Sequence, residues 1–156
     1  MRIVRSVGWA LALLAVGTVQ LSHAQYPTAA NGTWNLDIAK SDFGTDTPPK
    51  SARVVLAGTS TLRTWSEETV SADGTAQRES WKGAVDGRFY PIQGDPDGAT
   101  FAYMKDGSIA VKDRSGKVVE NTTWSLSADG KTLTQHQTIH TASGDESRTV
   151  VLRRAK

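Results

Sequence analysis

The sequence predicts a small all-β domain, an antiparallel up-and-down meander of about 8–10 strands closed into a barrel. Glycine-containing turn motifs, many of them Asp-Gly, recur at short intervals along the chain, and Asp-Gly favours the positive φ angles of tight hairpin turns. Between them lie runs of about 5–10 residues rich in the strand formers Thr, Val, Trp and Tyr. No segment keeps a 3.6-residue apolar period, so no long helix is expected. Closure removes the exposed edges of such a meander, which favours a barrel over the alternative, a sandwich.

Ten segments between these turns are predicted to be strands. In chain order they are residues 32–37, 52–57, 61–70, 76–84, 88–92, 100–105, 108–113, 118–126, 132–140 and 148–154. The stretch 38–50 ends in Pro48-Pro49, and we expect it to be a loop with one short helical turn.

The first 24 residues have the three-part pattern of a secretory signal peptide. Arg2 and Arg5 give a positive start, an uncharged apolar run follows, and the small residue Ala24 precedes Gln25. A membrane anchor is the alternative, but the apolar run is shorter than the roughly 20 residues that span a bilayer. We therefore expect cleavage after Ala24, no stable membrane insertion afterwards, and a single domain over residues 25–156 in the periplasm or outside the cell.

The charge balance argues against nucleic acid as a partner. The chain has 18 Lys and Arg against 16 Asp and Glu, and loss of Arg2 and Arg5 leaves 16 of each. A domain of zero net charge offers no general basic surface. The chain also lacks cysteine, so neither a disulfide nor a lipid-attachment cysteine is available. We expect a monomer stabilised by its core alone.

One short motif resembles a known family. Gly32 and Trp34 form a Gly-x-Trp at the start of the first strand, similar to the signature of lipocalins and other calycins. The resemblance implies that Trp34 plugs one end of the barrel, with an arginine of the last strand packed over its ring. Arg153 and Arg154 both stand at the end of that strand, and we assign Arg153 to this role because guanidinium groups stack well on indole.

Longer segments resemble a group of small, exported, lipocalin-like bacterial proteins of mostly unassigned function. The similar segments are Gly-Thr-Trp-Asn-Leu at 32–36, Ala-Lys-Ser-Asp-Phe at 39–43, Tyr-Pro-Ile-Gln-Gly-Asp-Pro-Asp at 90–97 and Ser-Ala-Asp-Gly-Lys-Thr-Leu-Thr at 127–134. This resemblance implies a barrel and export, without indicating a particular ligand. The chain departs from typical lipocalins in lacking a disulfide and the second and third lipocalin motifs.

No catalytic or metal-binding motif stands out, and we expect no enzyme, metal or cofactor. There is no Gly-x-Ser-x-Gly elbow and no cysteine nucleophile. His136 and His140 are four residues apart, a separation of about 13 Å on a strand and too far for one metal ion. Asp95-Pro96-Asp97-Gly98 lacks the remainder of a calcium loop and is expected to be a rigid turn.

The acidic residues do not form a recognisable catalytic motif either. No carboxylate pair for hydrolysis can be identified among the many acids, and a structural or solvated role is expected for each. Those standing in predicted strands include Glu67, Glu68, Glu79 and Glu120.

The functional hypothesis is that the barrel binds a small amphipathic molecule inside or at its mouth, at the end opposite Trp34. Polar residues surround the strand tryptophans on both faces, whereas a filled barrel shows cleaner alternation. Indole rings supply apolar area and a few polar groups orient a ligand. The candidate binding residues are Arg63, Trp65, Arg78, Trp81, Tyr103 and Trp124.

The alternative to this hypothesis is that the tryptophans simply fill the core. The barrel is then a structural or protein-interaction module of the cell envelope. Arg78 in turn either faces solvent, pairs with an acid such as Glu79 or Glu120, or meets an anionic ligand group, because an unpaired buried guanidinium is costly.

Overall fold

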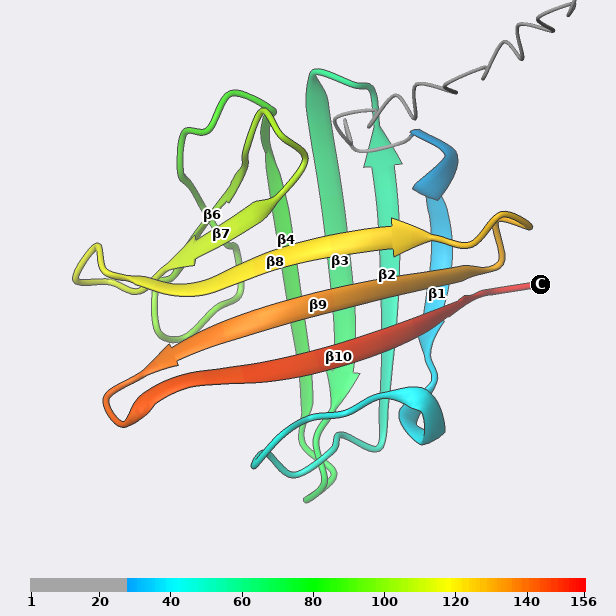
Figure 1. Cartoon of the computed structure of the whole chain (residues 1–156), viewed down its shortest axis with the longest axis horizontal. Helices are drawn as coiled ribbons and strands as arrows, with labels where there is room; N and C mark the ends of the chain where they lie inside the picture. Colours follow the sequence, from blue (N-terminus) through cyan, green and yellow to red (C-terminus); the bar gives the residue numbers. More distant parts are fainter. Residues whose placement is uncertain (1–27) are drawn as a thin grey trace, which may run out of the picture.

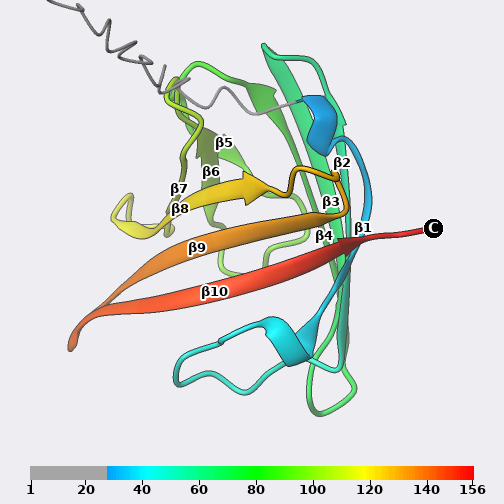
Figure 2. The same ribbon diagram turned by 45° about the vertical axis from the view of Figure 1, so that its right-hand side comes forward.

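The computed structural model describes residues 28–156, and the predicted signal peptide, residues 1–24, lies outside the described residues. Ten antiparallel strands form one sheet in the order β4-β3-β2-β1-β10-β9-β8-β7-β6-β5. Figure 1 shows that the C-terminal strands cross β1–β4 steeply, and the turned view of Figure 2 shows the sheet curling round on itself. The predicted all-β meander is confirmed.

The observed elements follow the predicted segments closely. They are η1 (Thr28–Ala30), β1 (Gly32–Leu36), η2 (Ile38–Lys40), β2 (Ser51–Gly58), β3 (Leu62–Val70), β4 (Ala76–Ala84), β5 (Tyr90–Pro91), β6 (Thr100–Tyr103), β7 (Ile109–Lys112), β8 (Val118–Leu126), β9 (Thr132–Thr141) and β10 (Gly144–Arg154). The predicted loop with one helical turn corresponds to η2 and the stretch after it. Among residues 28–156, no helix is long and apolar enough to cross a membrane.

Strand β10 begins four residues before its predicted start. Gly144 pairs with Thr141, and the ladder continues without a break to Arg153 and Thr132. The added residues are polar and extend the hairpin beyond the apolar core, where hydrophobic alternation gives no signal of a strand. Strand β5 is shorter than predicted, since only Tyr90 and Pro91 keep strand pairing.

The barrel is nearly closed by two different seams. On one side β1 pairs with β10 in register, with Trp34 opposite Arg154. On the other side a single bridge joins β4 to the segment after β5, where Ser80 and Gln93 exchange two backbone hydrogen bonds of 2.9 and 2.8 Å. The edge strands β4 and β5 are thus brought together with few backbone hydrogen bonds between them.

Trp81 reinforces the weaker seam from inside. Its Nε1 donates to the carbonyl oxygens of Tyr90 at 3.2 Å and Phe101 at 3.1 Å. Gly83 makes room for this ring, because a Cβ there would lie 2.4 Å from Cζ2 of Trp81 and 2.6 Å from Cδ2 of Tyr90. The absence of a side chain at residue 83 therefore allows the indole to lie flat against its own strand and reach across the seam.

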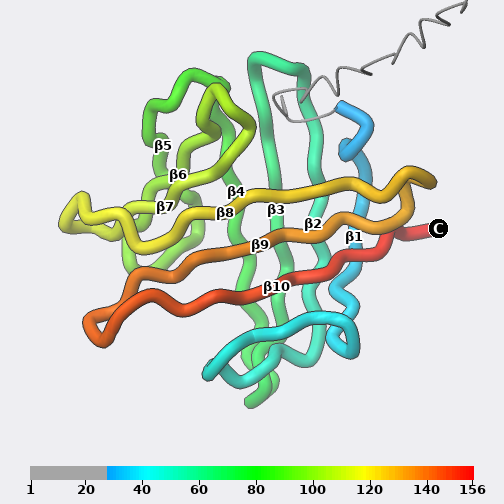
Figure 3. Tube along the Cα trace, viewed as in Figure 1, coloured from blue at the N-terminus to red at the C-terminus, as the bar shows by residue number. Residues whose placement is uncertain are grey.

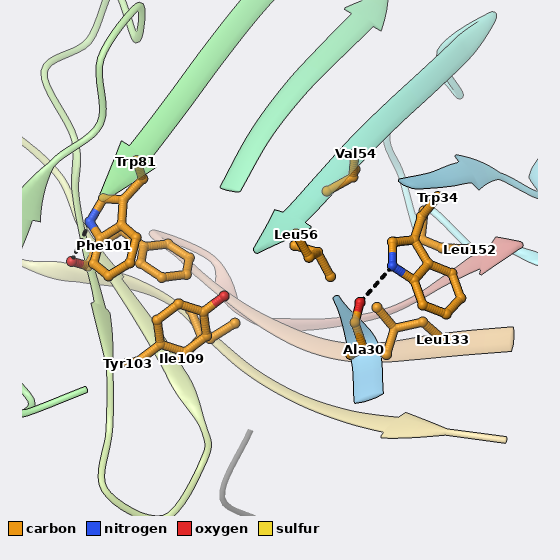
Figure 4. Packing of buried hydrophobic residues seen from close by; sticks show 10 residues of the cluster. All are labelled: Ala30, Trp34, Val54, Leu56, Trp81, Phe101, Tyr103, Ile109, Leu133 and Leu152. Atoms are coloured by element: carbon orange, nitrogen blue, oxygen red, sulfur yellow. Dashed lines mark hydrogen bonds between the residues drawn. The ribbon is translucent and has the colours of Figure 1, made fainter. Parts of the chain in front are cut away.

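Two apolar groups occupy the barrel, as the close view of Figure 4 shows. One surrounds Trp34 with Ala30, Leu133 and Leu152, and the other gathers Trp81, Phe101, Tyr103 and Ile109. The two ends of the barrel also differ in the backbone that covers them. Along the trace in Figure 3, η1 lies at one end of β1, and the η2 segment lies at the other.

Candidate ligand-binding cavity

A cavity of about 430 Å³ occupies the barrel interior away from the Trp34 end. Every second residue of the surrounding strands lines it, because successive side chains of a strand point to opposite faces of the sheet. The lining includes Trp65 and Glu67 on β3, Thr122 and Trp124 on β8, and Val150 on β10. The predicted alternative of an interior filled by side chains is therefore wrong for this part of the barrel.

The segment after η2 covers the end of the cavity opposite Trp34. Phe43 and Pro49 of this segment contribute to the lining. Two backbone hydrogen bonds join Asp42 to Thr149 at 2.7 and 2.9 Å, and Asp46 pairs with Arg148 at 2.7 Å. The mouth of the cavity is thus bounded by a loop that is tied to β10.

Four aromatic rings form a continuous part of the cavity lining. The rings of Trp65 and Phe101 meet edge to face with centroids 5.6 Å apart, and Phe101 meets Tyr103 at 5.0 Å. Tyr103 in turn stacks on Trp124 at 6.1 Å and an interplanar angle of 18°. Burial raises the pKa of Tyr103 well above its usual range, so its phenol is neutral. The buried Nε1 of Trp65 has no hydrogen-bond partner within residues 28–156.

Acidic residues line the cavity beside the aromatic ones, on the same strands. Glu67 and Glu79 face one another as a cross-strand pair on β3 and β4, and Glu120 enters from β8. Glu67 accepts a hydrogen bond from the Thr69 hydroxyl at 2.7 Å, and Glu120 accepts one from the Thr122 hydroxyl. Each donor stands two residues along the same strand, where the pleat returns to the same face.

Burial raises the pKa of each of these three carboxyl groups. The charge of Glu67 adds to the rise for both Glu79 and Glu120, and Asp95 adds to it for Glu79. The guanidinium of Arg148 lowers the pKa of Glu120 but less than burial raises it. The three glutamates therefore share one electrostatic environment that favours binding of positive charge.

Arg148 is the single basic residue among those that line the cavity, against the four acids Glu67, Glu79, Asp95 and Glu120. Its guanidinium is engaged elsewhere, by Asp46 at 2.7 Å and by Glu146 at 3.5 Å. The cavity thus combines an aromatic wall with a surplus of carboxylates.

The structure divides the predicted binding residues into two sets. Trp65, Tyr103 and Trp124 line the cavity. Trp81 is 2% exposed and forms part of the wall behind them. Arg63 is buried near the Trp34 end, where it donates to the Thr59 carbonyl at 3.1 Å and to Asn31 Oδ1 at 3.0 Å. Trp81 and Arg63 are outside the cavity lining.

The prediction that Arg78 belongs to an interior site is wrong. Its side chain is 76% exposed and pairs with Glu68 at 2.7 Å on the outer face of the barrel. The reason is parity, because Arg78 stands next to the inward-facing Glu79 on the same strand and successive side chains point to opposite faces. The alternative of an arginine that faces solvent is the correct one, and its acidic partner there is Glu68 instead of Glu79 or Glu120.

The predicted plug exists, with a different arginine. Trp34 is fully buried and donates from Nε1 to the Ala30 carbonyl at 2.9 Å. The guanidinium over its ring, 4.3 Å from the centroid, belongs to Arg154. Arg153, predicted for this role, faces outward and bonds Asp37 at 3.0 Å, because one step along β10 reverses the face.

Gly32 owes its place in the motif to this arginine. Its φ is +135°, and a Cβ there would lie 2.7 Å from Nη1 of Arg154. Arg154 also donates to the carbonyl oxygens of Asn31 at 2.7 Å, Ala29 at 2.6 Å and Gly130 at 2.7 Å. The arginine thus links the chain before β1, the β8–β9 turn and the end of β10 over one ring.

Sequence reasoning did not single out the three interior glutamates, although a signal was present. Glu67 stands two residues after Trp65, Glu79 two before Trp81, and Glu120 four before Trp124. Each glutamate therefore shares the face of a tryptophan on its strand. The buried tryptophans thus indicate which face of each of these strands turns inward.

Metal binding is not supported by the placement of donor side chains. Within residues 28–156, no group of three or more His, Asp or Glu side chains could hold a metal ion. His140 is instead hydrogen-bonded to Asn121 at 2.7 Å and to Asp145 at 2.8 Å.

Comparisons with known proteins identify a fold and no family. No family model matches the sequence, and no curated protein matches it either. The structure of zebrafish ileal bile acid-binding protein with cholic acid is similar with a TM-score of 0.52 at 14% identity, over 82% of this chain and all of that one. Lobster apocrustacyanin A1 has a TM-score of 0.49 at 11% identity, over 83% of this chain and 63% of that one. The barrel therefore has a lipocalin-like fold, and the resemblance to exported bacterial proteins stays a prediction.

Proposed function

We propose that this protein is a binding protein that holds one small amphipathic molecule inside its barrel and catalyses no reaction on it. The cavity of about 430 Å³ is the observation that carries the proposal, since sites for small molecules measure about 300–1,000 Å³. Trp65, Tyr103 and Trp124 provide the apolar contact area. The glutamates beside them on the same strands provide the fixed polar groups that orient such a ligand.

The similar zebrafish protein supports the same use of the fold. That protein is a bile acid-binding protein, and its structure was determined with cholic acid. At 14% identity the likeness concerns the fold alone, so the ligand class of this chain must come from its own cavity. We propose that the protein acts as a monomer and has no nucleic acid partner.

Binding can be tested with N-phenyl-1-naphthylamine, a neutral aromatic dye whose emission rises in apolar sites. We expect saturable binding of one dye per chain. Gln135→Phe places a ring in the cavity and should abolish or strongly weaken binding, because Gln135 lines it. His136→Phe is the matched control, since the adjacent residue is exposed on the opposite face and should leave the affinity unchanged.

Two results would count against the proposal. Non-saturable emission would indicate surface adsorption in place of a site. Equal loss of binding in Gln135→Phe and His136→Phe, with both variants folded by circular dichroism, would place the dye outside the cavity.

Export is a separate part of the proposal. It is supported by the pattern of Arg2, Arg5, the apolar run and Ala24. The intact mass of the protein recovered from expressing cells should correspond to a chain that starts at Gln25, and Ala24→Phe should block this processing. A membrane-bound product that retains Met1 to Ala24 would contradict it.

A further inference from the structure

The charged groups of the cavity are unequally matched. Four acids and one base line it, and the base, Arg148, is paired with Asp46 and Glu146. Within residues 28–156, no ion pair reaches Glu67, Glu79 or Glu120, since the six that form involve other acids. The interior of the barrel therefore has carboxylates available for a ligand, and its one cation is already engaged.

Placing carboxylates inside a barrel is costly unless they are paired or hydrogen-bonded. Each of Glu67 and Glu120 has a single threonine hydroxyl as a neighbouring donor. The outward neighbour Glu68, by contrast, pairs directly with Arg78 at 2.7 Å. The same strand thus carries a paired carboxylate on its solvent face and an unpaired one facing the cavity.

From this arrangement we infer that the ligand carries a positive charge, as an ammonium or other protonated amine attached to an aromatic or apolar body. The ammonium group would lie among Glu67, Glu79 and Glu120, and the body would lie against Trp65, Tyr103 and Trp124. The inference rests on the proposed function and adds the ligand class. It differs from the expectation of an anionic group bound by Arg78, which faces solvent.

The acidic and the aromatic residues of the lining both favour a positive charge. Ammonium groups donate up to three hydrogen bonds, and carboxylates accept them without donating when ionised. Aromatic faces attract cations and not anions. An anionic group entering the cavity would find both terminal nitrogens of Arg148 paired with Asp46 and Glu146, and only its buried Nε without a hydrogen-bond partner within residues 28–156. It would also lie close to the four carboxylates of the lining.

Three naphthalene probes of nearly equal size separate charge from shape. They are 1-naphthylmethylamine, a cation at neutral pH, 1-naphthalenemethanol, which is neutral, and 1-naphthoate, an anion. Titration calorimetry of the purified protein should give the tightest binding for the amine, weaker binding for the alcohol, and the weakest for the naphthoate. An ion pair in a partly buried site supports a difference of roughly tenfold or more between amine and alcohol.

The variants Glu67→Gln and Glu68→Gln form a matched pair. Both remove one carboxylate of β3 and keep the side-chain shape, but only the first lies on the cavity face. Glu67→Gln should lower the affinity for the amine by roughly tenfold and change the affinity for the alcohol by no more than about twofold. Glu68→Gln should change neither, apart from the small long-range effect of one exposed charge.

Lowering the pH should weaken binding of the amine and leave binding of the alcohol unchanged. The charged groups that face Glu67 from the surrounding elements are Glu79 on β4, Asp95 after β5, Glu120 on β8 and Arg148 on β10. Burial raises the pKa of all three glutamates, and neighbouring carboxylates add to the rise for Glu79 and Glu120, so the loss of amine binding should begin at a higher pH than for an exposed glutamate. Glu67→Gln should flatten this dependence.

The outcomes distinguish the ligand class from binding itself. If naphthoate or the alcohol binds as tightly as the amine, the inference of a cationic ligand is overturned and the proposed binding function stands. The same conclusion holds if the amine does not bind to a protein that binds the neutral dye. Failure of the dye and of all three naphthalenes would overturn both.

Discussion

Trp34→Ala tests the closed end of the barrel more directly than any other substitution. The ring is fully buried, donates from Nε1 to the Ala30 carbonyl at 2.9 Å and lies under the Arg154 guanidinium at 4.3 Å. Truncating a core tryptophan to alanine costs about 3–5 kcal/mol of the free energy of unfolding. The lost cation–π contact adds about 0.5–1 kcal/mol, so we expect a loss near the upper end of that range.

Urea denaturation followed by far-ultraviolet circular dichroism measures this loss, because the variant also removes a fluorophore. A domain of this size has about 5–15 kcal/mol to lose, so the midpoint should fall sharply. Trp65→Ala serves as the control and should cost less, since one side of the Trp65 ring faces a cavity. A loss below about 1 kcal/mol for Trp34→Ala, the range of many surface substitutions, would refute the plug.

Three further stability predictions follow from the same contacts. Gly32→Ala should destabilise by about 1–3 kcal/mol, since it combines a positive φ with a Cβ crowded against Arg154; unchanged urea melts would contradict this. Arg154→Ala should lower the unfolding free energy by several times as much as Arg153→Ala, whose exposed ion pair is worth about 0–1 kcal/mol, and equal losses would argue against the assignment. Glu67→Gln should stabilise the free protein at neutral pH, by about 1.4 kcal/mol for each unit by which the fold raises the Glu67 pKa.

The sign of the last prediction follows from the direction of the shift. The raised pKa means that folding favours the protonated carboxyl, so the folded state is relatively most stable below the unfolded pKa of Glu67. That advantage is lost as the pH rises through the raised value. Melts at several pH values should therefore show Glu67→Gln and the parent converging in acid and separating toward neutral pH. A variant less stable than the parent at neutral pH would contradict the burial argument.

Glu67→Gln thus joins the stability and ligand arguments in one substitution. We expect it to stabilise the empty protein and to weaken the binding of an amine. Opposite effects on stability and binding are typical of groups kept for function, because a binding site retains polar groups that the empty fold would do better without. A residue with a purely structural role would not separate the two measurements in this way.

Much of the architecture was predictable because its causes are local. Asp-Gly turns and runs of strand formers act over a few residues, so ten strands could be placed from the sequence. The Gly32 and Trp34 motif likewise predicted a plug before its contacts were known. The extension of β10 back to Gly144 was missed because its added residues are polar on both faces and pair beyond the core.

The sequence by itself determined the strands, their order along the chain and the motif at the closed end. Tertiary structure alone decided which face of each strand turns inward, and a shift of one residue reverses that choice. Pairing of Trp34 with Arg154 across β1 and β10, segments separated by nearly the whole domain, selected Arg154 over Arg153. The same parity placed Arg78 outside and Glu67, Glu79 and Glu120 within. Register between distant strands depends on closure of the whole barrel, so the charge of the cavity became visible only in three dimensions.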